Sequence, residues 1–390
     1  MNALTRDPWL DGSGVRVRRH RGPSGRTLYV ALAPGGPGGR RRALPGNGGL
    51  RVVTGAPPSG GARRLGRRLA VEMLLKHRLH RTGFSGAKLL VTGAAGVDEE
   101  LLAWIAAVLG QHAGRLYTGA DMGVTAVDME RLARLSPYVL NAVGSRAEPH
   151  ASTAAGVRGA VEAWARGPVA GMRVLVHGAG KVGAVLAAEL AAAGAGVLVH
   201  DRDPAAAEVP GCTAVRDWTG AEVDVFVPCS VSDLVDPALA RTLRCGAVIG
   251  SANAVLADEE ATLRVLAERG ILYLPTPLVG AGAVIVDSIE YYAPEAFRLA
   301  EPHEVYAFVR ATVGDAVRWL LDAASDLSPA ALLRERQSLS APVPVPGVPA
   351  ARSAAGPEER FCGLRFAPAG LADRGRPTGG RVPDGAAGGG

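Results

Sequence analysis

The pattern of apolar and polar positions in the first 145 residues predicts a mixture of strands and helices. Residues 26–34 alternate in hydrophobicity as a half-buried strand does, and residues 60–80 carry an apolar stripe at helical spacing. Residues 87–93 form a second short apolar strand. Residues 98–112 predict a helix, because Asp98 and the two glutamates after it suit a helix N-terminus.

From about residue 150 the pattern becomes that of a parallel sheet. Residues 150–165 predict a helix, and the apolar runs "MRVLVHGAG", "GVLVHD", "VDVFVPC" and "GAVIGSAN" follow at intervals. These runs lack alternation, as expected of strands that are buried on both faces. Strands that alternate with helices predict an α/β domain of the Rossmann kind. Residues 286–326 return to a helical pattern.

The chain therefore divides into five predicted segments. They are a basic flexible arm (1–24), an α/β domain (25–145), a Rossmann domain (150–285), C-terminal helices that return to the first domain (286–330), and a disordered tail rich in Pro, Ala and Gly (338–390).

Composition supports two ordinary globular domains. The 390 residues are 48% hydrophobic and 21% charged, and no charge-free apolar run reaches the length of a membrane span. No apolar core of a signal peptide is visible, which favours the cytoplasm. The cysteines and histidines show no metal-ligand spacing, so we expect free thiols and no metal site.

The net charge of +6 does not predict nucleic-acid binding. Residues 1–50 hold nine arginines against two aspartates, so the rest of the chain is close to neutral. Few aromatic residues accompany these arginines, and glycine and proline are common among them. A basic segment of this kind is more often solvated than bound to nucleic acid.

A glycine-rich loop at residues 178–183 predicts dinucleotide binding. Its three glycines match G-x-G-x-x-G, follow a strand and open a helix, and Asp201 ends the next strand. That arrangement brings backbone N–H groups to a pyrophosphate and a carboxylate to the ribose. Asp201 favours NAD over NADP, although Arg202 weakens this preference. The alternative is a tight turn that binds nothing. The expected cofactor-binding residues here are Gly178, Ala179, Gly180, Lys181, Val182, Gly183 and Asp201.

Lysine is rare in this chain, and its positions are informative. Arginine supplies all but three of the 43 basic residues, and the lysines are Lys76, Lys88 and Lys181. A buried lysine beside another cation can lose its proton and act as a base, whereas arginine cannot. Lys181 lies in the glycine loop, where any long side chain would serve. For Lys76 and Lys88 the alternative is a pair of surface lysines.

Asp121 is a third candidate for chemistry. It lies in "YTGADMGV", just before Thr125 and Asp128, whose spacing predicts a capping box for the next helix. Because that box already caps the helix, Asp121 is free for another role.

These motifs together resemble the glutamate/leucine/phenylalanine/valine dehydrogenase family over about residues 25–290. The motifs that carry the resemblance follow in the family's order: "GGLR" (48–51), "MLLK" (73–76), "SGAK" (85–88), "GADMG" (119–123), "TAAGV" (153–157), "GAGKVG" (178–183), "VPCS" (227–230) and "GSAN" (250–253).

The resemblance implies a role for each matched residue. Lys76 would bind the substrate's α-carboxylate, Lys88 would be the base that activates water, and Asp121 would shuttle a proton of the amino group. Asn47 stands where glutamate enzymes carry a lysine, which favours a neutral substrate. The remaining implied residues are Gly48 and Gly49 at the substrate, and Thr153, Ser230 and Asn253 at the cofactor.

The resemblance also implies the overall activity. Residues 25–145 would hold the substrate and the contacts of a homo-oligomer, the Rossmann domain would hold NAD, and a cleft would separate them. The reaction would be reversible NAD-dependent oxidative deamination of a neutral L-amino acid. The chain departs from the family's motif at two positions: Thr276 stands for an aspartate and Gly280 for an asparagine. A second possibility is therefore a repurposed relative that acts on another 2-oxo acid or imine. A non-catalytic NAD-binding protein is the third possibility.

Overall fold

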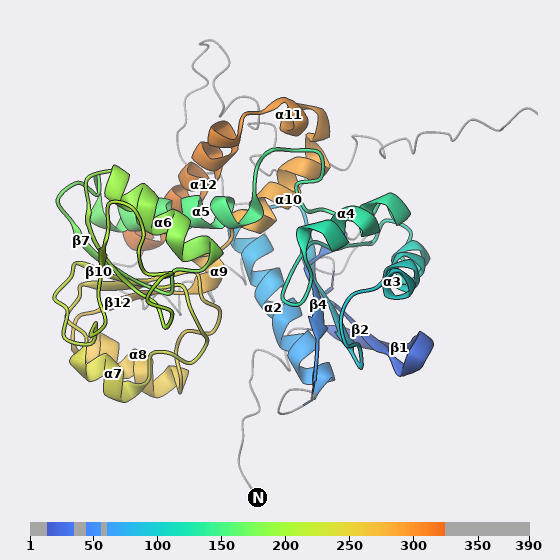
Figure 1. The fold of residues 1–390 in the computed structure, drawn as a ribbon, viewed down its shortest axis with the longest axis horizontal. Helices are drawn as coiled ribbons and strands as arrows, with labels where there is room; N and C mark the ends of the chain where they lie inside the picture. Colours follow the sequence, from blue (N-terminus) through green and yellow to red (C-terminus); the bar gives the residue numbers. More distant parts are fainter. Residues whose placement is uncertain (1–13, 35–43, 56–60, 324–390) are drawn as a thin grey trace, which may run out of the picture.

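The structure, a computed structural model, describes residues 14–34, 44–55 and 61–323. Two lobes are visible, each built around a β-sheet, with helix α2 (Ala62–His80) between the two sheets (Figure 1). The mixed α/β class expected from the sequence is confirmed. Within the described residues, no helix combines the length and the hydrophobicity needed to cross a membrane.

The N-terminal lobe contains a mixed sheet in the order β1-β2-β5-β3-β6, with β4 also paired to β5. Strand β2 runs antiparallel to β1 and β5, whereas β3 and β4 run parallel to β5. The strands are β1 (Arg16–Arg21), β2 (Thr27–Leu32), β3 (Gly46–Asn47), β4 (Leu50–Val53), β5 (Ser85–Thr92) and β6 (Leu116–Tyr117).

Strand β1 corrects one prediction. Residues 16–21 were expected to belong to a flexible arm, but they pair with β2 along their whole length, and a short 3₁₀ turn, η1 (Pro23–Gly25), joins the two. Four arginines in this strand conceal its pattern, because an edge strand that faces solvent needs few apolar residues. The rest of the predicted arm, residues 1–13, lies outside the described residues.

Helices cover both faces of this first sheet. Helix α2 packs on one face through Ala70, Val71 and Leu74, against Ala31 of β2. Helices α3 (Glu99–Gln111) and α4 (Ala126–Leu135) cover the other face. Since both faces are covered, seven of the eight residues of β5 are buried. The predicted caps are confirmed: Asp98 accepts a hydrogen bond from the Leu101 N–H, and Thr125 with Asp128 forms a capping box.

The second lobe contains a six-stranded parallel sheet in the order β12-β11-β10-β7-β8-β9. The order reverses beside β7, so the crevice at the carboxyl end of β7 is the expected ligand position of such a sheet. The elements are β7 (Arg173–His177), α6 (Lys181–Ala192), β8 (Gly196–His200), β9 (Thr213–Ala214), β10 (Val225–Pro228), α7 (Pro237–Thr242), β11 (Ala247–Ile249), α8 (Glu259–Glu268) and β12 (Leu272–Leu274).

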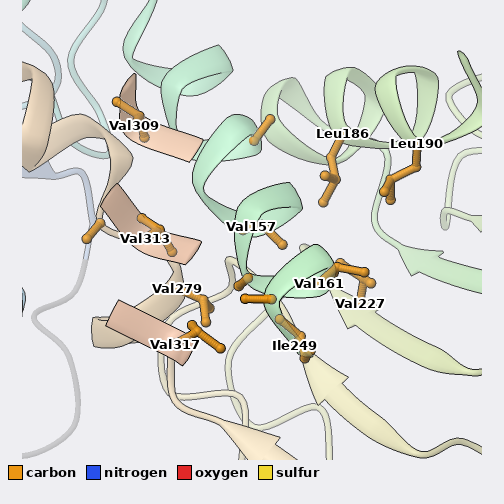
Figure 2. Packing of buried hydrophobic residues seen from close by; sticks show 14 of the residues in the cluster. Val157, Val161, Leu186, Leu190, Val227, Ile249, Val279, Val309, Val313 and Val317 are labelled. Atoms are coloured by element: carbon orange, nitrogen blue, oxygen red, sulfur yellow. The ribbon is translucent and has the colours of Figure 1, made fainter. Parts of the chain in front are cut away.

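Helix α5 (Pro149–Ala165) is at the centre of the largest core. Its Val157 and Val161 lie among Leu186 and Leu190 of α6 and Val227 of β10, and the valines of α12 (Pro302–Ala323) pack on its other side (Figure 2). Full burial of these side chains stabilises the lobe, at about 1.5–3 kcal/mol for each valine or leucine.

The chain after β12 returns to the first lobe. It forms α9 (Thr276–Val279), α10 (Gly282–Tyr292), α11 (Pro294–Leu299) and α12. Ser288 and Tyr292 of α10 donate hydrogen bonds to the carbonyl oxygens of Thr82 and Gly83, which follow α2. Helix α10 therefore belongs to both lobes. The predicted tail, 338–390, lies outside the described residues.

Candidate active site

Lys88 and Asp121, which are 33 positions apart in sequence, are in contact. The Lys88 Nζ lies 2.5 Å from the Asp121 Oδ2, and Arg51 donates to the same carboxylate from Nε at 2.7 Å and from Nη2 at 3.2 Å. Strands β4 and β5 are paired neighbours and carry Arg51 and Lys88. A Cβ on Gly49 would lie 2.8 Å from the Asp121 Cβ and 3.1 Å from the Lys88 Nζ, so this cluster requires glycine there.

Burial and the charge of neighbouring groups shift the pKa values in this cluster in opposite directions. Burial lowers the pKa of Lys88 below its ordinary value, and this outweighs the attraction of Asp121; the positive charge of Arg51 lowers it further. For Asp121, burial acts to raise the pKa, but Lys88 and Arg51 outweigh it and hold the pKa well below its ordinary value. The result is an ionised aspartate beside a lysine that loses its proton more easily than usual.

Lys76 of α2 is half-buried, and its charge interacts with the same cluster. Burial lowers the pKa of Lys76, and the positive charge of Lys88 lowers it too, while Glu72 and Asp121 act in the opposite direction. The two lysines are therefore close enough to interact, and neither has the surroundings of a solvated surface lysine. This removes the alternative that both are ordinary surface residues.

Asn47 and Gly48 adjoin this cluster, on β3 and directly after it. Asn47 is fully buried, and its Nδ2 donates to the Asp287 Oδ2 at 2.7 Å. The His77 Nε2 lies 3.1 Å from the Asn47 carbonyl oxygen. Burial lowers the pKa of His77 to about 3, so this histidine is neutral and its Nε2–H donates to Asn47. A Cβ on Gly48 would overlap the Ala87 carbonyl oxygen.

The glycine loop of the second lobe has the shape of a pyrophosphate cradle. Gly178 has a φ of +99°, and a Cβ there would lie 2.6 Å from the Ser230 Cβ. Gly183 packs against the Gly178 carbonyl oxygen, which brings α6 close to the strand. A Cβ on Gly180 would meet nothing within 4 Å, so the start of α6 faces open space. Lys181 is exposed and Val182 is half-buried.

Asp201 holds this loop together from the end of β8. Its Oδ2 accepts a hydrogen bond from the Ala179 N–H at 2.7 Å, and its Oδ1 accepts one from the Asp203 N–H at 2.9 Å. Burial acts to raise the pKa of Asp201, but these N–H groups hold it below its ordinary value. The carboxylate is thus ionised and fixed beside the loop.

The other predicted cofactor residues lie on neighbouring elements. The exposed Ser230 follows β10, and its Oγ is 2.7 Å from the His177 Nδ1. Thr153 lies in α5 one turn after Pro149, and its Oγ1 donates to the Pro149 carbonyl oxygen. Its Cα is 2.6 Å from where a Cβ on Gly282 would be, so Thr153 lies beside the start of α10. Asn253 is exposed in the segment after β11.

The two departures, Thr276 and Gly280, are coupled. The Thr276 Oγ1 donates to the Ala252 carbonyl oxygen at 2.6 Å, and the side chain is buried. A Cβ on Gly280 would lie 3.0 Å from the Thr276 Cγ2. The threonine methyl group therefore leaves little room for a longer side chain at position 280.

Sequence reasoning missed two residues of this site. Arg51 was part of the "GGLR" motif but was given no role, although a basic residue two positions after Gly49 is a usable signal. Asp287 is 240 positions from Asn47, and its place depends on how α10 returns to the first lobe. No local signal in the sequence identifies it.

Comparison with known proteins decides the family. A family model described as Glutamate/Leucine/Phenylalanine/Valine dehydrogenase matches residues 199–335. The leucine dehydrogenase of Thermoactinomyces intermedius is 31% identical over 264 residues, which cover 62% of this chain and 70% of the relative. The chain belongs to this family.

A second member of the glutamate/leucine/phenylalanine/valine dehydrogenase family matches over a shorter part of its length. The phenylalanine dehydrogenase of Caldalkalibacillus thermarum is 30% identical over 237 residues, 55% of this chain and 64% of that enzyme. The chain thus spans just under two thirds of that relative. The resemblance inferred from the motifs is confirmed, and the relatives are amino acid dehydrogenases.

Solved structures confirm the fold. The L-tryptophan dehydrogenase of Nostoc punctiforme is similar with a TM-score of 0.66 at 23% identity, covering 84% of this chain and 96% of that one. A hetero-hexameric glutamate dehydrogenase of Thermus thermophilus has a TM-score of 0.65 at 20% identity, covering 84% and 88%. The predicted two-domain arrangement with a Rossmann lobe is therefore the fold of this chain.

Proposed function

We propose that the chain catalyses the reversible, NAD-dependent oxidative deamination of a neutral L-amino acid. The amino acid, water and NAD⁺ would give the 2-oxo acid, ammonium and NADH. The observation that carries this proposal is the buried contact of Lys88 with Asp121, which Arg51 also holds. Buried lysines with a lowered pKa beside a specific charge partner cluster at catalytic sites, which favours an enzyme over a protein that only binds a nucleotide.

The glycine loop fits NAD. Gly180 leaves open space at the start of α6, where backbone N–H groups are free to meet a pyrophosphate, and the first turn of α6 carries no acidic residue. Asp201 would accept hydrogen bonds from the adenosine ribose. Thr153, Ser230 and Asn253 would line the remainder of the cofactor site. When bound, NAD⁺ supplies the chemistry of accepting a hydride from the substrate's α-carbon.

Side chains of the first lobe would bind the substrate's α-carboxylate and transfer protons to and from the reacting groups. Lys76 would bind the α-carboxylate, since it is the cation next to Lys88 that forms no ion pair with Asp121. Asp121 would accept a proton from the α-amino group. Lys88, in its neutral form, would take a proton from the water that attacks the imino carbon. Arg51 is a positioning residue that fixes the Asp121 carboxylate.

The Asn47 environment argues against an anionic side chain. A substrate carboxylate placed beside Asn47 would be buried close to Asp287, which has no cation within ion-pair distance in the described part of the chain, and a buried carboxylate without a cation is strongly unfavourable. Glutamate should therefore be a poor substrate. This supports the prediction of a neutral side chain, with Gly48 and Gly49 forming the adjacent backbone wall.

A second candidate function has one specific observation in its favour. Thr276 and Gly280 stand where the resembled motif has an aspartate and an asparagine, and the Thr276 methyl group fills space beside position 280. A repurposed enzyme that acts on another 2-oxo acid or imine would use the same lysines with a different substrate. In either case we propose that the first lobe holds the substrate, that the second lobe holds NAD, and that the protein forms a homo-oligomer.

One assay separates the candidates. Purified protein is given a panel of L-amino acids with NAD⁺, and the absorbance of NADH is followed. The reverse reaction is tested with 2-oxo acids, ammonium and NADH. Turnover of a neutral amino acid supports the first proposal. Activity only with an imine or an unusual 2-oxo acid supports the second, and NAD binding without turnover of any of these compounds would contradict both.

A further inference from the structure

The segment that crosses from the first lobe to the second is held by Glu290 of α10. This crossing segment, residues 141–148, leads into α5 and contains no helix or strand. The Glu290 Oε2 accepts a hydrogen bond from the Ala142 N–H at 2.7 Å, and its Oε1 accepts one from the Val143 N–H at 3.0 Å. Consecutive N–H groups therefore engage both oxygens of one carboxylate. The proton transfers of the proposed reaction do not use Glu290.

The start of the crossing segment has a backbone shape that binds an anion. Ala142 has a φ of +55° and Gly144 a φ of +74°, both in the left-handed region. For alanine this conformation is unfavourable, so surrounding contacts must hold it. Such a turn directs successive N–H groups toward one point and forms a concave anion site. The Asn141 N–H also acts on the Glu290 carboxylate, which thus occupies a site built from three successive backbone groups.

Asn141, the first residue of the crossing segment, contacts the backbone that carries Asp121. The Asn141 Oδ1 accepts a hydrogen bond from the Ala120 N–H at 3.0 Å, and Ala120 directly precedes Asp121. The two stretches lie against each other, because a Cβ on Gly119 would lie 2.5 Å from the Leu140 carbonyl oxygen. On its other side the stretch pairs with β4. The backbone at Asp121 is therefore held between β4 and Asn141.

We propose that Glu290 is a positioning residue for Asp121. Its carboxylate fixes the turn that follows Asn141, and the Asn141 side chain fixes the Ala120 N–H. Asp121 then keeps the orientation in which it contacts the Lys88 Nζ and accepts a proton from the substrate's amino group. This inference rests on the proposed function, because it requires that Asp121 takes that proton.

The ionised form of Glu290 is the form that fits this turn. A carboxylate presents two acceptor oxygens to the N–H donors, whereas a carboxylic acid or a carboxamide presents one acceptor and one donor. Burial raises the pKa of Glu290 to about 7, although the N–H groups act to lower it. The charged groups around the turn in the described structure are Asp287 on the same helix, Arg298 on α11 and Arg146 of the crossing segment. The fit is thus present above about pH 7 and is lost as the pH falls below it.

A clasp that only joins the two lobes is the alternative role for Glu290. Tyr306 of α12 holds the far end of the crossing segment, because its hydroxyl oxygen accepts a hydrogen bond from the Glu148 N–H at 3.0 Å. If Glu290 acted only as a clasp, its loss would change the thermal midpoint, and loss of the Tyr306 hydroxyl would have the same kind of effect. A positioning role lowers kcat, and only from the end of the segment that reaches Asp121.

The first test measures turnover of the best amino acid of the substrate panel by Glu290→Gln. At about pH 9, kcat should fall about tenfold because the proton acceptor is misplaced, while the KM values for the amino acid and NAD⁺ change less than about twofold. Tyr306→Phe is the matched control and should keep the wild-type kcat. An unchanged kcat in Glu290→Gln, or an equal loss in both variants, would show that Glu290 is only a clasp.

The pH dependence gives a second measurement on the wild type and Glu290→Gln. The ratio of their kcat values should be about tenfold at about pH 9 and approach one at about pH 5.5, where Glu290 of the wild type is protonated. Protonation of Lys88 slows both proteins alike and cancels in this ratio. A ratio that stays constant between these pH values would contradict the requirement for an ionised carboxylate.

Asn141→Ala tests the route from Glu290 to Asp121. This variant should lower kcat by a factor similar to that of Glu290→Gln, and the double variant should be no slower than the slower single variant, because both changes release one contact. Losses that multiply in the double variant would overturn this route. If Glu290→Gln fails to fold, Asn141→Ala beside Tyr306→Phe still decides. A wild-type protein that turns over no amino acid or 2-oxo acid would overturn the proposed function, and this inference with it.

Discussion

The candidate substrate site in the first lobe and the candidate nucleotide site in the second lobe are built from different groups. In the first lobe, Lys88, Asp121 and Arg51 are in direct contact, and burial and charge shift their pKa values. In the second lobe, the loop consists mainly of glycines, and its shape depends on where a Cβ would or would not fit. Under the proposed function, side chains would carry out the chemistry in the first lobe and backbone groups would bind the cofactor in the second. Substitutions in the two lobes should therefore have separable effects.

Lys88→Ala should have the largest effect on turnover. Removing the base should lower kcat by about 10²- to 10⁴-fold, while NAD⁺ affinity stays at the wild-type value because Lys88 is in the other lobe. Isothermal titration with NAD⁺ and a turnover assay check the two parts separately. Normal turnover by this variant would remove Lys88 from the mechanism.

Lys88→Arg is the matched control. It keeps a positive charge beside Asp121, but a guanidinium does not lose its proton, so kcat should fall as far as in Lys88→Ala. If Lys88→Arg retained most of the activity, the role of Lys88 would be electrostatic instead of that of a base.

Gly180→Val should weaken NAD⁺ binding without changing the stability of the fold. The valine side chain meets no protein atom within 4 Å at its Cβ, so the thermal midpoint should be unchanged. The same side chain would occupy the space expected for the pyrophosphate and should weaken NAD⁺ binding at least about tenfold, or about 1.4 kcal/mol. Thermal unfolding and titration with NAD⁺ measure both. Unchanged NAD⁺ affinity would show that the cofactor does not bind over Gly180.

Asp201→Arg should change cofactor preference more than total activity. An arginine beside the loop can pair with a 2′-phosphate, so the ratio of NADP to NAD efficiency should rise about tenfold. Because Asp201 also holds the Ala179 and Asp203 N–H groups, Asp201→Asn serves as the control for loop geometry. Equal ratios in Asp201→Arg and the parent would place the ribose elsewhere.

Arg51→Met should give the smallest effect, a shift of the pH profile. Lys88 must be neutral to act, so the rate rises with pH through the pKa of Lys88. Arg51 lowers that pKa, and removing its charge should move the acid limb of kcat/KM upward by about one pH unit. A profile that stays in place, with only kcat reduced, would limit Arg51 to orienting Asp121.

The sequence predicted the nucleotide half better than the substrate half. A strand, a glycine loop and a helix are neighbours along the chain, so Gly178, Gly180 and Asp201 could be placed by local spacing. Lys88 and Asp121 were also identified, but their contact with Arg51 depends on the pairing of β4 with β5.

The features that sequence reasoning missed share a physical cause. Strand β1 is held by hydrogen bonds to β2 and needs few apolar side chains. Its arginine-rich sequence is therefore similar to that of a solvated segment. Asp287 reaches Asn47 because the chain after β12 returns to the first lobe. Interactions of this kind depend on tertiary contacts between distant segments, and periodicity carries no information about them.

The most direct test of the proposed oxidative deamination measures NADH and ammonium together during turnover of one amino acid. Oxidative deamination requires one ammonium for each NADH, with Lys88→Ala forming neither at a comparable rate. If the proposed reaction is correct, the wild-type protein forms NADH and ammonium in equal yields. NADH formed without ammonium, or equal rates in the wild type and Lys88→Ala, would contradict it.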